Sequence, residues 1–151
     1  MTFTKRCVIF KLSKKLFMAT ISFKPKQVTK KITSHLHDRA RDVVMSRFGL
    51  TADAERKTLE EIGKKYGITR ERVRQIEESA INLIKKSEAY KGEQAVFEEL
   101  KQLMHTLGHV VAEHEFLPYV AKDKAIQNHI HFYLAICDHF KKHREDDHFH
   151  T

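Results

Sequence analysis

The chain has 151 residues, of which 41% are hydrophobic and 32% are charged, as in one globular domain or two small ones. Five glycines and two prolines are few, so we expect helices to dominate. Cys7 and Cys137 fit no zinc-ligand spacing, which favours a reduced, cytoplasmic protein. No apolar run is long enough to span a bilayer or to act as a secretory signal, so membrane association is not expected.

The formal net charge of +8 is concentrated in the first third of the chain. Residues 1–50 contain twelve Lys and Arg but two acidic residues, whereas the other two thirds are close to neutral. Such a basic segment either attracts nucleic acid without sequence preference or merely keeps the chain soluble. Residues 1–27 lack a regular apolar period, and we predict a basic, disordered segment there, with Met1 or Met18 as the translation start.

Residues 28–48 are predicted to form one helix, because apolar residues recur in them at helical spacing. The apolar stripe consists of Val28, Ile32, Leu36, Ala40, Val43 and Val44. Gly49 ends this helix, and the polar residues 51–57 form a loop. The helix gives the shorter ones that follow a partner to pack against, which short helices need.

The stretch after this loop predicts two short helices joined by a tight turn. Thr58 and Glu61 have the spacing of a capping box, so a helix begins at Leu59. Gly67 is suited to the left-handed conformation that ends a helix, and Thr69 is a suitable N-cap for the next one. Two helices joined in this way form a helix-turn-helix unit.

Three further residues make this prediction more specific. Gly63 lies where two closely crossing helices require a small residue, and Val73 and Ile76 fill the wedge between them. An ordinary pair of antiparallel helices, with no role in nucleic-acid binding, is the alternative interpretation.

The second helix of the pair has a polar side opposite its apolar side. The apolar side consists of Val73, Ile76, Ala80 and Leu83. The polar side consists of Glu71, Arg74, Gln75 and Glu78, flanked by Arg70 and Arg72. Arginine pairs with guanine, glutamine with adenine, and glutamate accepts from cytosine, so the polar side is suited to base edges in a major groove. On geometry alone the two flanking arginines are suited to phosphates.

At these residues the chain resembles a known family. The segments RDVVMSRFGL and, above all, TLEEIGKKYGITRERVRQIE are similar to region 4 of the bacterial sigma-70 factors. The resemblance covers residues 39–86, about a third of the chain. It implies a three-helix domain that binds the promoter −35 element in the major groove, with RNA polymerase core as a possible partner.

The resemblance also implies roles for individual residues. Base contacts are expected from Arg70, Glu71 and Gln75, to which the geometry of the helix adds Arg74. Phosphate contacts are expected from Thr58, Leu59, Thr69 and Arg72, and Arg74 matches a family position near the phosphates as well. Nothing in the chain resembles sigma region 2, which reads the −10 element and opens the duplex, so promoter melting is not expected.

The second half of the chain predicts a separate unit. Residues 90–94, with Gly92, are predicted to form a linker between a domain at 28–91 and a domain at 92–151. The expected order after the linker is a helix ended by Gly108, a strand at 109–111, helices at 112–120 and 125–137, and a hairpin at 139–149. This order resembles a small winged-helix-like α+β domain, and the fold as a whole is expected to be mainly α.

Nine of the eleven histidines lie between His105 and His150. The set His139, His143, His148 and His150 suggests a metal site as an alternative, but no family metal signature supports it. No nucleophile, general base or phosphate-binding glycine loop is recognisable, so no enzyme activity, cofactor, metal or small-molecule substrate is expected.

The sequence therefore predicts a DNA-binding transcription protein that holds double-stranded promoter DNA without melting it. The alternative is an interaction module of the same fold that docks on RNA polymerase or another transcription factor, with its arginines facing acidic groups. A histidine-based metal sensor is the third hypothesis.

Overall fold

The structure is a computed structural model that describes residues 21–108 and 111–141. These residues form helices and connecting turns, with no strand among them, so the mainly helical fold is confirmed. None of these helices is both long and apolar enough to cross a membrane. The helices are α1 (Pro25–Thr33), α2 (Asp38–Phe48), α3 (Leu59–Tyr66), α4 (Arg70–Lys86), α5 (Glu88–Gly92), α6 (Gln94–Leu107), α7 (Glu113–Val120) and α8 (Lys124–Ile136).

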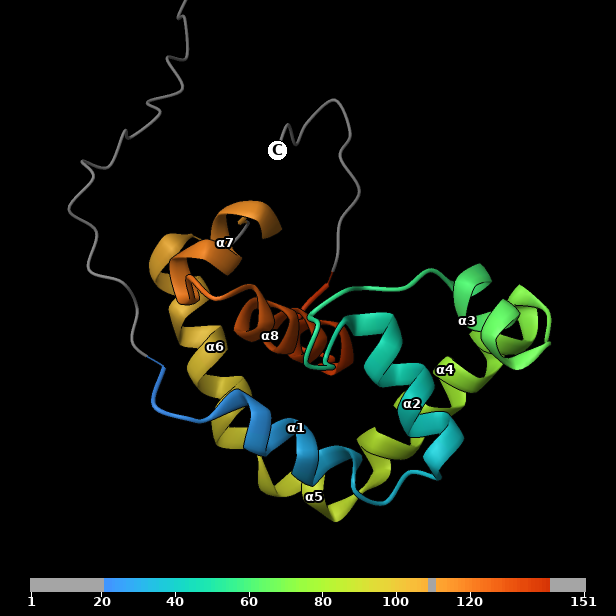
Figure 1. The fold of residues 1–151 in the computed structure, drawn as a ribbon. Coiled ribbons are helices and arrows are strands. Elements are labelled where there is room, and N and C mark those ends of the chain that lie inside the picture. The colour runs from blue at the N-terminus through green and yellow to red at the C-terminus, as the bar shows by residue number, and fades with distance from the viewer. Residues whose placement is uncertain (1–20, 109–110, 142–151) are drawn as a thin grey trace, which may run out of the picture.

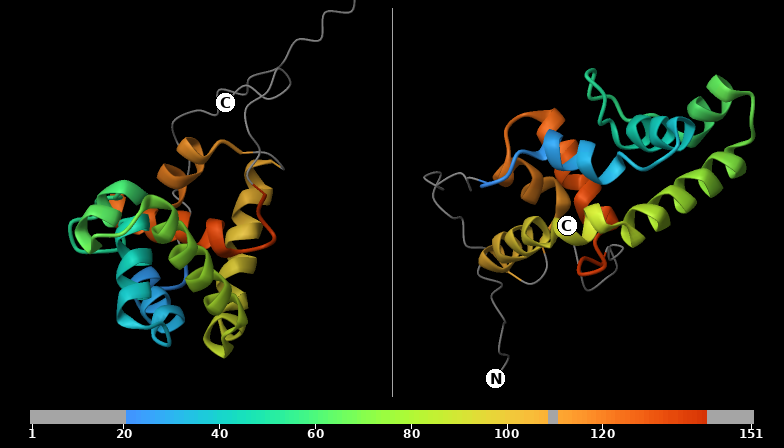
Figure 2. Two further views of the ribbon diagram at one scale, coloured as in Figure 1. Left: turned by 90° about the vertical axis from the view of Figure 1, so that its right-hand side faces the viewer. Right: turned by 90° about the horizontal axis from the view of Figure 1, so that it is seen from below.

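Helix α4 connects the two ends of the molecule. The turn between α3 and α4 lies at one extremity, and α1, α5, α6, α7 and α8 gather at the other (Figure 1). In the right-hand view of Figure 2, α4 extends as a long rod from α3 to α5. The N-terminal turns of α4 therefore project away from the larger group of helices.

Two hydrophobic clusters hold this arrangement together. The smaller has Val43, Ile62 and Val73 at its centre and joins α2, α3 and α4. The larger takes buried side chains from every helix in the described residues except α3. Ala80 and Ile84 extend α4 into the larger cluster. Helix α4 thus belongs to both clusters, which fixes the helix-turn-helix relative to the rest of the fold.

Helix α8 lies at the centre of the larger cluster, beside α1 and α2. The Tyr133 hydroxyl donates to the Pro25 carbonyl oxygen at 2.5 Å and lies 2.7 Å from Thr29 Oγ1. Thr29 Oγ1 also lies 2.7 Å from Nδ1 of His129, whose pKa is lowered by burial. The larger cluster draws on residues from both sides of the predicted boundary at 91/92. That boundary stays a prediction.

The prediction of one helix over residues 28–48 is wrong, because a non-helical turn interrupts the helix between α1 and α2. The break is held by Arg41, whose Nε donates to the Thr33 oxygen at 3.1 Å and whose Nη2 donates to the Ser34 and Leu36 oxygens at 2.8 Å. These bonds satisfy carbonyl groups at the end of α1 and in the turn that follows it. The Thr33 oxygen also accepts from the Leu36 N–H at 3.1 Å. Helix α1 also begins at Pro25, inside the segment predicted to be disordered, while residues 1–20 lie outside the described residues.

Two further expectations need correction. The predicted linker at 90–94 is largely the short helix α5, capped by Ser87, whose Oγ accepts from the Tyr90 N–H at 3.1 Å. Leu83, expected on the apolar side of α4, is 50% exposed. The predicted helices beyond residue 92 are present as α6, α7 and α8.

The winged-helix part of the prediction is not confirmed. Residues 109–110 of the predicted strand, and residues 142–149 of the predicted hairpin, lie outside the described residues. Residues 138–139, where the hairpin is expected to begin, form a turn, and residues 140–141 have no regular structure.

The contacts of Arg41 lead to a stability prediction. We expect Arg41→Ala to lower the free energy of unfolding by about 1–3 kcal/mol, because charge-assisted hydrogen bonds to three carbonyl groups are lost. Arg39→Ala is the matched control, because within the described residues the exposed Arg39 side chain makes only a ring contact, 5.0 Å from the centroid of the half-buried Tyr66. We expect that change to cost no more than about 1 kcal/mol. Urea unfolding measures the free energy of unfolding of both variants. Equal losses of this free energy in the two variants would contradict the role given to Arg41.

Candidate nucleic-acid interface

Helix α3 begins with a capping box, as predicted. Thr58 Oγ1 accepts from the Glu61 N–H at 3.2 Å, and Glu61 Oε2 accepts from the Thr58 N–H at 2.7 Å. The hydrogen bond from the Thr58 backbone, followed by that from its hydroxyl, lowers the pKa of the Glu61 carboxyl. The Glu61 carboxylate lies near the N-terminus of α3, where its negative charge interacts favourably with the helix dipole. Residue Leu59 is thereby fixed as the first residue of α3.

The turn into α4 also agrees with the sequence prediction. Gly67 has φ +63°, the left-handed region that glycine adopts without strain. Gly63 contacts this turn so closely that an added Cβ would lie 2.6 Å from the Ile68 oxygen. Thr69 Oγ1 accepts from the Arg72 N–H at 3.2 Å, which caps α4. The predicted helix-turn-helix is therefore confirmed in its bounds and in its turn.

The predicted site residues lie at the starts of the two helices. Thr58 and Thr69 are exposed at the caps, and Leu59 is half-buried in the first turn of α3. The first two turns of α4 expose Arg70, Glu71, Arg72, Arg74 and Gln75. Val73 lies between them in sequence and is fully buried. This burial fixes the rotation of α4 and directs its polar side to solvent at the extremity seen in Figure 1.

Two side-chain networks lie on the polar side of α4. Arg74 Nη2 donates to Glu71 Oε1 at 2.6 Å, its Nε donates to Glu71 Oε2 at 3.0 Å, and its Nη1 pairs with Glu78. The first of these carboxylates raises the pKa of Arg74 most, and Arg74 in turn lowers the pKa of Glu71. Arg72 Nη1 donates to Gln75 Oε1 at 3.1 Å. Exposed ion pairs contribute little to stability because solvent screens them, so a ligand displaces them at small cost.

Arg70 and Arg74 differ in the side-chain partners that they have within the chain. The Arg70 side chain makes no hydrogen bond or ion pair with another residue in the described part of the chain, although its charge helps to lower the pKa of Glu71. Arg74 must leave two carboxylates before it can contact any ligand. Base and phosphate roles for Arg74 both stay predictions.

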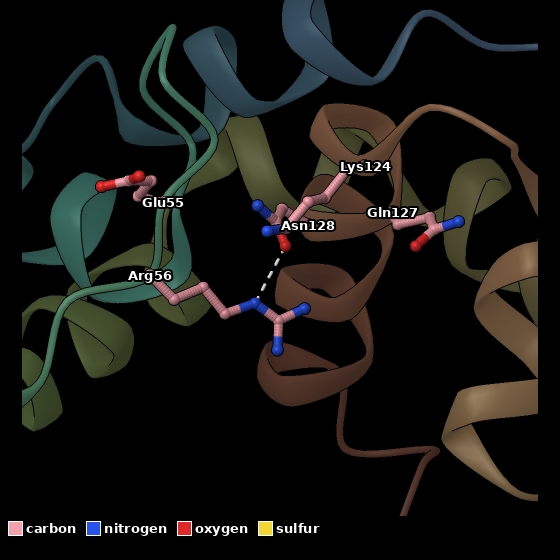
Figure 3. A pocket seen from close by; sticks show the side chains of 5 residues that line it. All are labelled: Glu55, Arg56, Lys124, Gln127 and Asn128. Atoms are coloured by element: carbon pink, nitrogen blue, oxygen red, sulfur yellow. Dashed lines mark hydrogen bonds between the residues drawn. The ribbon is translucent and has the colours of Figure 1, made fainter.

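The structure also reveals contacts around the 51–57 loop that the sequence did not indicate. Arg56 reaches from this loop towards α8, where its Nε donates to Asn128 Oδ1 at 2.9 Å (Figure 3). An open pocket of about 450 Å³ lies between the loop and α8. Its lining consists of Glu55, Arg56, Lys124, Gln127 and Asn128. No local pattern signals this contact, because Arg56 and Asn128 are 72 positions apart.

The metal alternative has no support in residues 21–108 and 111–141, where no three His, Cys, Asp or Glu side chains are arranged to hold an ion. Three of its four histidines, namely His143, His148 and His150, lie outside the described residues.

Comparison with known proteins matches residues 34–86 to the family described as Sigma-70, region 4. Over 54 residues the chain is 50% identical to the protein named RNA polymerase sigma factor RpoD in Helicobacter pylori strain 26695, and equally so to its counterpart in strain J99. The matched segment is 36% of this chain and 8% of each relative, so the chain corresponds to a small part of their length. The predicted resemblance to region 4 is thus confirmed for this segment.

The close contact at Gly63 leads to a second prediction. We expect Gly63→Ala to force α3 and the turn apart, because the new Cβ meets a backbone oxygen that has no flexible side chain to move. Overpacking costs about 1–3 kcal/mol and outweighs the helix-propensity gain of about 1 kcal/mol.

Gly92→Ala is the matched control, because an added Cβ at Gly92 meets nothing within 4 Å. Thermal unfolding should show destabilisation for Gly63→Ala alone. An unchanged melting temperature in Gly63→Ala would mean that the close approach of α3 to the turn is not a constraint.

Proposed function

We propose that this chain is a DNA-binding transcription protein that reads duplex DNA resembling a promoter −35 element through the major groove. The observation that carries the proposal is the first two turns of α4, which expose Arg70, Glu71 and Gln75 on a capped and firmly packed helix. A side chain on a fixed helix loses little freedom when it binds a base edge. The match of residues 34–86 to sigma-70 region 4 supports the same function.

In this proposal the starts of both helices position the protein on the DNA backbone. Thr58 and Leu59 begin α3, and Thr69 and Arg72 begin α4, where unpaired N–H groups and the helix dipole favour phosphate. Arg70, Glu71, Arg74 and Gln75 then face base edges. Phosphate contacts set the register, whereas base contacts supply the sequence preference.

The alternative remains a protein-interaction module that docks on RNA polymerase core or another transcription factor. The name of the Helicobacter pylori relatives associates them with RNA polymerase, which favours polymerase as the protein partner. Leu83 lies on α4, one helical turn after Ser79, and is exposed. It would give such a surface an apolar side chain. DNA and polymerase binding are compatible, and in both cases the chain would act in the bacterial cytoplasm.

Substitutions in α4 test the direct reading of bases. We expect Arg70→Ala and Gln75→Ala each to weaken binding to a preferred duplex by about 1–3 kcal/mol and to relax the preference at one base pair. Arg72→Ala should weaken binding to all duplexes alike. It should also reduce the magnitude of the slope of log K against log salt concentration by about 0.9. Fluorescence anisotropy against matched and scrambled duplexes measures these effects.

Lys86→Ala, an exposed basic residue at the far end of α4, is the control for loss of charge alone. It should leave the preference between matched and scrambled duplexes unchanged. If Arg70→Ala and Gln75→Ala behave like this control, α4 does not read bases.

We further propose that the chain anchors on duplex DNA without opening it. Strand opening requires aromatic platforms on which unpaired bases stack. The chain contains no Trp, and the aromatic side chains Tyr90, Phe97, Phe116, Phe132 and Tyr133 are buried in the larger cluster. These rings are therefore not available for stacking with bases.

Permanganate footprinting checks this proposal. Core RNA polymerase with the full chain should leave promoter thymines near the start site as unreactive as core polymerase alone does. A complete sigma factor serves as the positive control. Reactive thymines that depend on this chain would make it an initiation factor and overturn the proposal.

A further inference from the structure

A side chain from α8 holds the loop that leads into α3. Asn128 is 1% exposed. Its Nδ2 donates to the oxygens of Gly49 at 3.0 Å and Ala54 at 2.9 Å, and its Oδ1 accepts from Arg56 Nε at 2.9 Å. Gly49 has no space for a side chain, since an added Cβ would lie 2.8 Å from Asn128 Nδ2. Asn128 also lies outside the segment that matches sigma-70 region 4.

This contact fixes one edge of the Arg56 guanidinium and leaves the other available. Within the described residues no hydrogen bond or ion pair involves the two Nη groups of Arg56. Lys124, in the first turn of α8, lines the same pocket and adds positive charge. Glu55 also lines it, but its carboxylate points away from the guanidinium in Figure 3. A guanidinium binds phosphate through two parallel N–H donors, and a tethered one loses less freedom in doing so.

The position of Arg56 in the chain brings it near the DNA-binding end of α3. A chain spans at most about 3.6 Å per residue, so the Cα of Arg56 lies within about 11 Å of the Cα of Leu59. Each strand of duplex DNA carries one phosphate per about 3.4 Å of helix axis. A strand that meets the start of α3 therefore presents further phosphates within this distance.

We infer that Arg56, positioned by Asn128, binds an additional phosphate of duplex DNA beside those contacted at the start of α3. The inference rests on the proposed function, because it requires a duplex at the helix-turn-helix. It gives α8 a part in DNA binding. This helix lies outside the family segment, and it holds the loop and directs the Arg56 guanidinium, which lies within that segment. Asn128 is then a positioning residue, and Arg56 the residue that touches the ligand.

The salt dependence of DNA binding by the full chain tests the contact. We expect Arg56→Gln to weaken binding to matched and scrambled duplexes by the same factor. The slope of log K against log salt concentration should become smaller in magnitude by about 0.9, since one phosphate contact is lost. When salt rises from about 50 to 200 mM, affinity falls by some factor, and this factor should be about three- to fourfold smaller for the variant than for the wild type. Lys122→Gln, which removes an exposed charge between α7 and α8, should leave the slope unchanged.

A merely structural Arg56 gives a different result. Its loss would reduce the fraction of folded protein but leave the salt slope of the folded molecules as in the wild type, and that outcome overturns the inference. A wild-type chain that binds no duplex overturns the proposed function and this inference together. Wild-type binding with an unchanged slope in Arg56→Gln overturns the inference alone.

Asn128 is tested by a double-mutant cycle. We expect Asn128→Ala to lower the slope by less than Arg56→Gln does, and the two changes together to lower it by no more than Arg56→Gln alone, because they act through one contact. Additive effects would show that Asn128 does not position Arg56.

If Asn128→Ala fails to fold, phosphate-ethylation interference decides the matter. One phosphate should then be required by the wild type but not by Arg56→Gln. Identical interference patterns would contradict a contact from Arg56.

Discussion

The close approach of α3 to the turn that follows it is the constraint on which the rest of the structure depends. Gly63 has no Cβ, and the carbonyl oxygen of Ile68 occupies the space where one would lie. The approach allows Val73 to pack against Ile62 with no exposed surface. Because α4 is fixed at Val73, its rotation is fixed as well, and its polar side faces solvent. The candidate interface is therefore a consequence of backbone packing and not of the charged residues themselves.

The rest of the chain holds this unit from behind. Helix α4 continues from the smaller cluster into the larger one through Ala80 and Ile84, so the two clusters cannot move independently without bending it. Helix α8 adds a second connection, since Asn128 bonds to the loop before α3. Residues beyond the segment similar to sigma-70 region 4 thus support that segment at its C-terminal end and at the loop before α3. This arrangement suits a module that must present a rigid face to a long, stiff ligand.

The features that could be predicted from the sequence are those set by neighbouring residues. Thr58, Glu61, Gly67 and Thr69 act within one turn of helix, so their spacing alone predicts where α3 begins and ends and where α4 begins. The break between α1 and α2 could not be predicted in this way, because no Gly or Pro marks it and the guanidinium that holds it comes from the next helix. The same applies to Asn128 and Arg56, which meet only once the chain is folded. Which base or phosphate each residue of α4 contacts stays a prediction, because such contacts depend on a second molecule and not on the fold of this chain.

The central claim is that the polar side of α4 reads a duplex sequence, and selection from a random duplex library tests it most directly. The full chain is incubated with the library at physiological salt, and bound duplexes are amplified and sequenced over several rounds. The account predicts that one short motif is enriched, and that a variant carrying both Arg70→Ala and Gln75→Ala no longer enriches it while still retaining bulk DNA. Enrichment of no motif by the wild type, or of the same motif by the variant, would contradict the account.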